Sequence, residues 1–324
     1  MSRDGILVAG GSGMSRDIIL VTGGRGFVGA AVVRHLLGSG RQVHVFGTDS
    51  PVELPTGAEQ TIGSIEQLTL LDDVIGQLKP SAVLHLASFS SETNGLTRSG
   101  EIDPHTMLRV NVLGFQNLLE SCVRHRIQRV LWTSSTVVFG AELSPGQRLD
   151  EGAPKRPLVH YGLSKVLAEE MAAFYRQREG LQVTGLRIPL MLGVGLWYRG
   201  AAASVADLVR QALGLDSKPL SVPFHSFDAM NVKDMGGLVQ TLLDHGATLS
   251  PLYNVSGFTT SYPDIIQTLT ELVPGFRARA NVTPAAIVYP LVSQTLLERE
   301  TGWRQRYDLT ETLLDLINES KGVL

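Results

Sequence analysis

The feature that most constrains the fold is an apolar run, Ile18 to Val21, that breaks into a glycine-rich turn. A short, wholly apolar run of this kind is typical of a parallel strand covered on both faces. Gly23, Gly26 and Gly29 then recur at every third residue, and Ala30 to Leu37 continue as an apolar helix. Glycines let the backbone approach a pyrophosphate, and the free N–H groups of a helix start favour its charge. The stretch predicts a dinucleotide cradle, the alternative being the same tight turn without a ligand.

The beginning of the chain carries a near-duplicate of this stretch. Residues 1–13 nearly repeat residues 14–26, and both copies begin Met-Ser-Arg-Asp. Only the second copy continues into an apolar helix, and helix N–H groups are what hold phosphate. We therefore expect residues 1–13 to be a dispensable, mobile extension that binds no cofactor.

Strand-like and helical patterns alternate after the turn. Strands are predicted at 42–46, 61–65, 82–87, 129–132 and 183–188, and helices at 65–78, 107–123 and 160–178. This alternation predicts an α/β, Rossmann-like, doubly wound parallel sheet over residues 14–188. Beyond Pro189 the alternation loosens. Residues 189–324 are expected to form mainly a smaller C-terminal substrate-binding domain, with a segment near 225–255 returning to the Rossmann domain.

Composition excludes several classes of protein. The 28 basic and 31 acidic residues give a net charge of −3, which favours neither nucleic acid nor an anionic membrane as a partner. No apolar run approaches the roughly 18–20 residues needed to span a bilayer, and the N-terminus lacks a signal-peptide pattern. The single cysteine, Cys122, fits a reducing compartment. We expect a cytoplasmic protein that acts on a small molecule without a metal ion.

Three features carry chemistry. Tyr161 and Lys165 are four residues apart near the start of a predicted helix, so they share one face. A neighbouring cation lowers a tyrosine pKa and makes the phenol a usable acid or base. Ser134 and Ser135 end an apolar strand, where hydroxyls can polarise a substrate oxygen beside a cofactor. Asn111 lies mid-helix among apolar residues, where an amide is either a structural hydrogen bonder or a catalytic group.

Taken in order, these residues resemble the extended short-chain dehydrogenase/reductase family, also called the NAD-dependent epimerase/dehydratase family. The resemblance runs from Ile18 nearly to the C-terminus. Thr22 to Gly29 match the family's nucleotide turn, His85 to Ser88 its fourth-strand segment, and Asn111 to Leu119 its central helix. Ser134 to Gly140 match its active-site strand, and Tyr161 to Lys165 its catalytic pair. The family's C-terminal landmarks are matched by Val232 to Asp234, Tyr253 to Val255 and Leu297 to Trp303.

The resemblance implies a role for each matched residue. Tyr161 would exchange a proton with the substrate oxygen, and Lys165 would lower the Tyr161 pKa and hold the nicotinamide ribose. Ser135, or Ser134 one residue earlier, would hydrogen-bond the same oxygen, and Asn111 completes the catalytic set. The implied cofactor-binding residues are Gly23, Arg25, Gly26, Phe27, Val28, Gly29, Thr48, Ser64, Ile65, Leu86, Ala87, Ser88, Tyr161, Lys165 and Ile188. The implied substrate-binding residues are Ser135, Thr136, Leu190 and Trp197.

Departures from the family pattern narrow the function. Gly47 stands where NAD-preferring members carry an acidic residue that holds the ribose 2′-hydroxyl. Arg25 can pair with a phosphate, so NADP is favoured over NAD as the NAD(P)(H) cofactor, although Asp49 is a possible replacement for the missing acid. Sugar-nucleotide dehydratases carry Thr-Asp-Glu where this chain has Ser-Thr-Val from Ser135, which excludes a dehydratase.

Two further departures concern the substrate. Leu190 and Phe227 stand where members that bind nucleotide sugars carry Asn and Arg, and an apolar pair cannot neutralise a diphosphate. Arg187, Arg199 and Arg210 are candidate substitutes for the missing cation.

We therefore weigh three functions. The preferred one is an NAD(P)-dependent oxidoreductase that interconverts an alcohol and a ketone on a small, non-nucleotide substrate. The alternative is a nucleotide-sugar epimerase that uses the same Ser–Tyr–Lys set. A nucleotide-sensing regulatory protein of the same fold is disfavoured by the intact catalytic pair. The resemblance also implies a possible homodimer through the helices that carry Asn111 and Tyr161.

Overall fold

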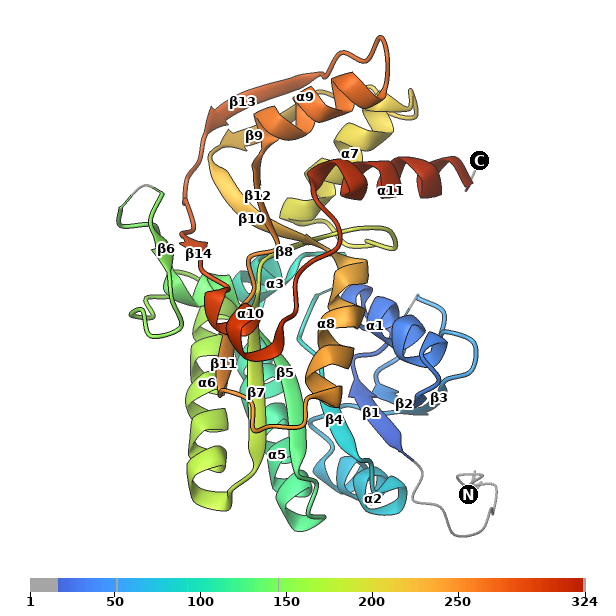
Figure 1. Ribbon diagram of the computed structural model, residues 1–324, viewed down its shortest axis with the longest axis vertical. Helices are drawn as coiled ribbons and strands as arrows, with labels where there is room; N and C mark the ends of the chain where they lie inside the picture. The colour runs from blue at the N-terminus through green and yellow to red at the C-terminus, as the bar shows by residue number, and fades with distance from the viewer. Residues whose placement is uncertain (1–16, 51, 92, 145, 323–324) are drawn as a thin grey trace.

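The computed structural model describes residues 17–50, 52–91, 93–144 and 146–322. The extension predicted at residues 1–13 lies outside the described residues. Figure 1 shows a large sheet flanked by helices in its lower part and a smaller group of strands and helices at the upper end. No helix within the described ranges is both long and apolar enough to cross a membrane.

The large sheet has seven strands, all parallel, in the order β11-β7-β5-β4-β1-β2-β3. This arrangement confirms the predicted α/β, Rossmann-like fold. The central strands are buried along almost their whole length because helices cover both faces of the sheet. The strands are β1 Ile18–Thr22, β2 Gln42–Gly47, β3 Glu59–Ile62, β4 Ala82–His85, β5 Arg129–Ser135, β7 Gln182–Ile188 and β11 Leu252–Asn254.

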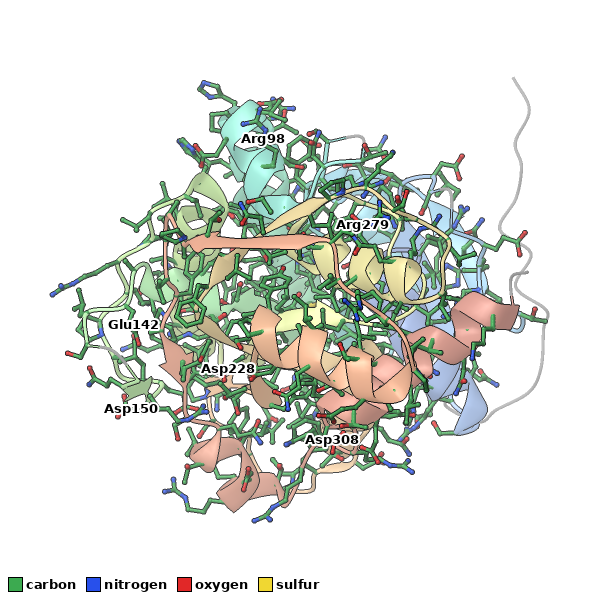
Figure 2. The ribbon with its side chains drawn as sticks, turned by 90° about the horizontal axis from the view of Figure 1, so that it is seen from above. Arg98, Glu142, Asp150, Asp228, Arg279 and Asp308 are labelled. Atoms are coloured by element: carbon green, nitrogen blue, oxygen red, sulfur yellow. The ribbon has the colours of Figure 1, made fainter. Side chains whose placement is uncertain are left out.

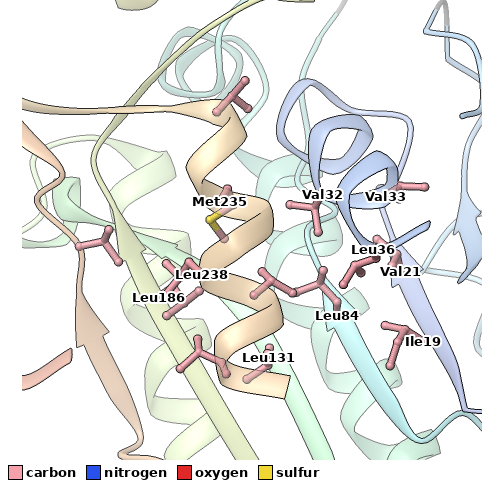
Figure 3. Close-up of a cluster of buried hydrophobic side chains, with 14 of the residues drawn as sticks. Ile19, Val21, Val32, Val33, Leu36, Leu84, Leu131, Leu186, Met235 and Leu238 are labelled. Atoms are coloured by element: carbon pink, nitrogen blue, oxygen red, sulfur yellow. The ribbon is translucent and has the colours of Figure 1, made fainter. Parts of the chain in front are cut away.

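The sheet has a separate hydrophobic core on each face. On one face, α1 (Phe27–Gly38) packs beside α8 (Val232–Asp244). Figure 3 labels Leu36 and Leu238 of these helices in the same core as Leu84 of β4. The core of the other face lies under helices that bring in Leu71, Phe115 and Ala168, among other residues. These helices are α2 Leu68–Leu78, α5 Phe115–Arg124 and α6 His160–Glu179.

The upper part is built on a three-stranded sheet in the order β12-β10-β8 and a β13-β9 pair. Figure 2 views the molecule from this end, with Asp228 of β10 labelled. The segment around 225–255 contributes to both parts. β10 belongs to the small sheet, whereas α8 packs against the large sheet and β11 is one of its strands. The elements of this part are β8 Leu190–Leu192, α7 Ala201–Ala212, β9 Leu220–Phe224, β10 Ser226–Asn231, β12 Phe258–Ser261, α9 Tyr262–Leu272, β13 Ala280–Pro284 and α11 Leu309–Gly322. Short elements between the parts are β6 Arg148–Leu149, β14 Leu291–Val292 and α10 Thr295–Thr301.

Several predicted element boundaries were wrong: β4 ends at His85 and not at residue 87, β5 continues beyond residue 132 to Ser135, and α2 begins at Leu68 and not at residue 65. The strand expected at 61–65 runs from Glu59 to Ile62, because Gly63 turns there and its N–H donates to the Gly47 carbonyl. The single helix expected at 107–123 is interrupted: α4 (Pro104–Leu108) is followed by a π-helical turn, Arg109–Gly114, before α5 begins. Another short helix, α3 (Leu96–Ile102), precedes them.

Candidate active site

The glycine turn between β1 and α1 is shaped so that only glycine fits at two of its positions. Gly23 has a φ of 74°, and a Cβ on it would lie 2.6 Å from the Ala87 backbone nitrogen. A Cβ on Gly29 would lie 2.1 Å from the Gly23 carbonyl oxygen. Gly26, before the first residue of α1, supplies no side-chain cap, so the N–H groups of the first helical turn remain available to an anion. The local geometry therefore fits the pyrophosphate of a dinucleotide.

A cavity of about 720 Å³ opens at this turn, within the range of small-molecule and cofactor sites. Its walls are the carboxyl ends of β1, β2, β3 and β4, where ligands bind in open parallel sheets. Of the predicted cofactor residues, nine line it: Gly23, Arg25, Gly26, Thr48, Ser64, Ile65, Leu86, Ala87 and Ser88. Phe27, Val28, Gly29, Tyr161, Lys165 and Ile188 are not part of its lining.

The cavity also has lining residues that sequence reasoning missed. Ser50, Glu66, Phe89, Ser90 and Thr93 all contribute to its walls. Each follows the end of β2, β3 or β4, so the rule that ligands bind at strand carboxyl ends was the signal that would have found them.

Arg25 lines the cavity but is not free. Its guanidinium donates to the Asp49 carboxylate at 2.9 Å and to the Val52 carbonyl at 2.8 Å. It also donates to the Ser50 carbonyl. The Arg25 side chain is 16% exposed, whereas that of Asp49 is 88% exposed. The arginine is therefore held at the cavity wall by the loop after β2, and its acidic partner is the exposed member of the pair.

Tyr161 lies in the first turn of α6 with its ring buried against β5. Burial raises the Tyr161 pKa above its ordinary value, a hydrogen bond with Ser135 opposes the rise, and the nearby Tyr198 adds to it. The expectation that the Tyr161 pKa is lowered was wrong for this structure, because desolvation of the phenolate outweighs every other influence. Tyr161 is thus a protonated phenol whose hydroxyl is paired with that of Ser135, the arrangement of a general acid.

Lys165 is one helical turn beyond Tyr161 and is also buried. Its Nζ donates to the Thr133 carbonyl at 2.8 Å and lies 5.6 Å from the centre of the Tyr161 ring. Burial lowers the Lys165 pKa to about 8, and the negative charge of Glu169 opposes that decrease. The ammonium is therefore still charged at neutral pH, but its pKa is only slightly above that pH.

The structure separates the two serines that sequence reasoning left open. Ser134 is fully buried, and its hydroxyl donates to the Glu169 carboxylate at 2.7 Å. Ser135 points to the opposite side of β5 and makes the contact with Tyr161. Ser134 is occupied inside the protein, so Ser135 is the hydroxyl available to a substrate.

Asn111 lies in the π-helical turn with its amide fully engaged. Its Oδ1 accepts from the Phe89 N–H at 2.9 Å and from the Ser88 hydroxyl at 3.2 Å. Its Nδ2 donates to the Ser164 hydroxyl of α6 at 3.0 Å. Asn111 therefore ties the cavity wall after β4 to the helix that carries Tyr161, a positioning role that the extra residue of a π turn permits.

The remaining predicted substrate residues come from three segments. Thr136 follows Ser135 at the end of β5, and Leu190 begins β8. Trp197 lines the cavity, and its Nε1 is buried with no hydrogen-bond partner in the described part of the chain. The adjoining Tyr198 meets Phe27 of the glycine turn, with ring centres 6.2 Å apart. The loop after β8 thus connects the cavity wall at Trp197 with the start of α1 at Phe27.

Comparison with known proteins agrees with this geometry. Residues 19–256 match the NAD dependent epimerase/dehydratase family. A uronate dehydrogenase from Pseudomonas syringae pv. tomato is 37% identical over 82 residues, 25% of this chain and 30% of that protein. A UDP-glucose 4-epimerase from Streptomyces lividans is 32% identical over 161 residues, 48% of this chain and 46% of that protein. The matches therefore span less than half the length of these curated relatives.

A solved structure extends the similarity to almost the whole chain. MoeE5 in complex with UDP-glucose and NAD is 27% identical, with a TM-score of 0.80, and the match covers 94% of this chain and 99% of that one.

Proposed function

The chain belongs to the NAD dependent epimerase/dehydratase family, and on that premise we propose that it is an NAD(P)-dependent oxidoreductase. It transfers hydride between a nicotinamide and an alcohol or ketone on a small, non-nucleotide substrate. The observation that carries the proposal is the buried Ser135–Tyr161–Lys165 set, linked through Asn111 to Ser88 in the wall of the cofactor-sized cavity.

The chain's own residues supply position and protons. The nicotinamide carries the hydride when it is bound. Tyr161 gives its phenolic proton to the substrate oxygen in the reductive direction and takes it back in the oxidative one. Ser135 donates a hydrogen bond to the same oxygen, and Lys165 holds the ribose while its charge stabilises the phenolate.

Two of the three arginines that could replace the missing cation are engaged in ion pairs, which supports a non-nucleotide substrate. The Arg187 side chain is 1% exposed and bound to Glu169. Arg199 is paired with Asp207 at 3.0 Å. Leu190 and Phe227 pack against the apolar core of the smaller domain, so neither addresses a diphosphate. The similarity to UDP-glucose 4-epimerase and to MoeE5 favours the second candidate, a nucleotide-sugar epimerase.

The cofactor preference proposed for this chain is NADP(H) over NAD(H). Gly47 ends β2 without a carboxylate, and Arg25 lies at the cavity wall beside it. The exposed Asp49 can turn away from Arg25 and leave the guanidinium to a 2′-phosphate. The MoeE5 structure contains NAD, so the preference is a property proposed for this chain alone.

One experiment tests both the reaction and the cofactor. The purified protein is screened with hydroxy acids, sugars and sugar acids in the presence of NAD⁺ or NADP⁺, and nicotinamide reduction is followed by absorbance. We expect net reduction with a small hydroxylated substrate, faster with NADP⁺. Faster turnover with NAD⁺ contradicts the cofactor preference. Protection of the protein from heat by UDP-glucose, together with epimerisation and no net reduction, replaces the proposal with the epimerase.

We also propose that the chain forms a homodimer through α6 and the neighbouring π-helical turn. Leu163, Leu167 and Phe174 of α6 form an exposed apolar stripe, 40%, 40% and 51% exposed, beside Leu113, which is 54% exposed. Sedimentation velocity is expected to give twice the mass of the chain, and Phe174→Glu is expected to give the monomer. A wild-type monomer at micromolar concentration contradicts the dimer.

A further inference from the structure

Behind the catalytic pair lies a buried ion pair that the proposed mechanism does not use. Glu169 is four residues beyond Lys165 on α6, so Tyr161, Lys165 and Glu169 share one helix face. The Glu169 and Arg187 side chains are each 1% exposed. Two charges at this depth contribute little net stability compared with apolar residues of the same volume. The stability of the fold therefore does not by itself explain why Glu169 and Arg187 are charged.

Arg187 holds the Glu169 carboxylate in one orientation. The guanidinium of Arg187, on β7, donates from Nε to Glu169 Oε1 and from Nη2 to Glu169 Oε2, both at 2.8 Å. This two-point contact fixes the plane of the carboxylate. The other terminal nitrogen of Arg187 donates to the Glu151 carbonyl at 3.0 Å, and the Arg187 guanidinium carbon lies 4.8 Å from the centre of the Phe139 ring. The arginine is anchored on several sides and cannot follow a ligand.

The fixed carboxylate acts on both elements of the active site. Glu169 Oε1 accepts from the Ser134 hydroxyl, which holds the end of β5 next to Ser135. On its own helix, Glu169 is the anion nearest to Lys165 in sequence. Lys155, whose Nζ lies 3.4 Å from Glu169 Oε2, closes the outer side of the cluster.

Lys165 Nζ is surrounded by the neutral Thr133 carbonyl and the Trp132 and Tyr161 rings, and Glu169 is the anion whose charge favours its ammonium form. Tyr161 and Glu169 face it from α6, and His85 faces it from β4. Burial and the charge of Lys165 lower the His85 pKa to about 3, so His85 is neutral at working pH. Arg187 and Lys155 both bind the Glu169 carboxylate. Removing the Glu169 charge would leave the Lys165 ammonium buried beside a second, unbalanced cation.

We propose that Glu169, fixed by Arg187, is a positioning residue that keeps the Lys165 ammonium charged and in place beneath Tyr161. This inference rests on the proposed acid–base function of Tyr161 and Lys165 and deepens it. The direction in which loss of Glu169 shifts the Lys165 titration follows from the charge of the lysine. Its charged form is lost as the pH rises through its pKa, and loss of the Glu169 anion moves that point to lower pH.

The primary test measures the Lys165 titration in the cofactor-free protein. Competitive acetylation with acetic anhydride at a series of pH values, read by mass spectrometry, gives the midpoint at which each lysine becomes reactive. We expect the matched control Glu170→Gln to keep the Lys165 midpoint of the wild-type protein. Glu170 is the neighbouring residue, with a side chain that is 66% exposed and paired with Lys155. In Glu169→Gln the midpoint is expected to be at least about one pH unit lower, a tenfold change in proton affinity.

The second readout is the pH dependence of turnover. The alkaline decline in kcat is expected to move to lower pH in Glu169→Gln by the same amount and to stay in place in Glu170→Gln. Because Glu169→Gln leaves a buried guanidinium without its counter-ion, the double variant Glu169→Met/Arg187→Met serves as a folded alternative. Its Lys165 midpoint is expected to lie between those of the wild type and Glu169→Gln.

Two outcomes overturn the inference. One is a wild-type Lys165 midpoint in a folded Glu169→Gln protein, and the other is a wild-type midpoint in the double variant. Either would make the ion pair purely structural. If Tyr161→Phe keeps its activity, the proposed function fails instead, whatever the Lys165 midpoint. The two failures are therefore distinguishable.

Discussion

Tyr161→Phe is expected to reduce turnover by about 100- to 10,000-fold, the usual contribution of a positioned acid or base. The substitution removes one hydroxyl and keeps the ring, which packs in the core beneath β5 and contacts the Lys165 ammonium. Stability and cofactor affinity should therefore change little. The measurement is kcat from initial rates, together with NADH and NADPH binding by fluorescence and the midpoint of thermal unfolding.

A control variant on the same helix sharpens this prediction. Tyr175→Phe removes a phenol from the same helix about four turns away. Its hydroxyl donates to Glu120 at 3.2 Å, and the substitution should leave kcat close to the wild-type value. A Tyr161→Phe protein that binds cofactor normally and retains more than about a tenth of its turnover contradicts the acid–base role.

Gly29→Ala is expected to abolish tight cofactor binding. The new Cβ would lie 2.1 Å from the Gly23 carbonyl oxygen, which is backbone and cannot turn aside. Relieving the clash must push the start of α1 away from the turn, at a cost of about 1–3 kcal/mol in stability. The same shift removes the alignment of the helix N–H groups with the pyrophosphate. We expect the dissociation constant for NAD(P)H to rise by at least about tenfold, which corresponds to roughly 1.4 kcal/mol.

Gly38→Ala is the matched control, because it lies at the other end of α1 and a Cβ there meets nothing within 4 Å. Relative to glycine, alanine favours a helix by about 0.5–1 kcal/mol, so this variant should be slightly more stable and bind cofactor normally. Isothermal titration and thermal unfolding of both variants check the pair. Equal cofactor affinity in Gly29→Ala and Gly38→Ala contradicts the proposed cradle.

Much of the fold could be predicted because its signals are local. The apolar run Ile18 to Val21 and the glycines after it specify a strand, a tight turn and a helix within a dozen residues. The ends of the helices and strands were harder to predict from the sequence. The π-helical turn at Asn111 depends on the contacts of that amide with Ser88, Phe89 and Ser164, which are far away in sequence. A period of 3.6 residues carries no sign of such contacts.

For the candidate site, the sequence by itself determined the residue types and their spacing. Tyr161 and Lys165 must share a helix face because they are four residues apart in a helix. Only the tertiary structure decided which of two adjacent serines faces Tyr161, since Glu169 binds the hydroxyl of Ser134. It also decided that the Tyr161 pKa is raised, because desolvation depends on everything packed around the phenol. Spacing along the chain determines which groups can meet, whereas burial and the partners brought in from other strands determine their charge and direction.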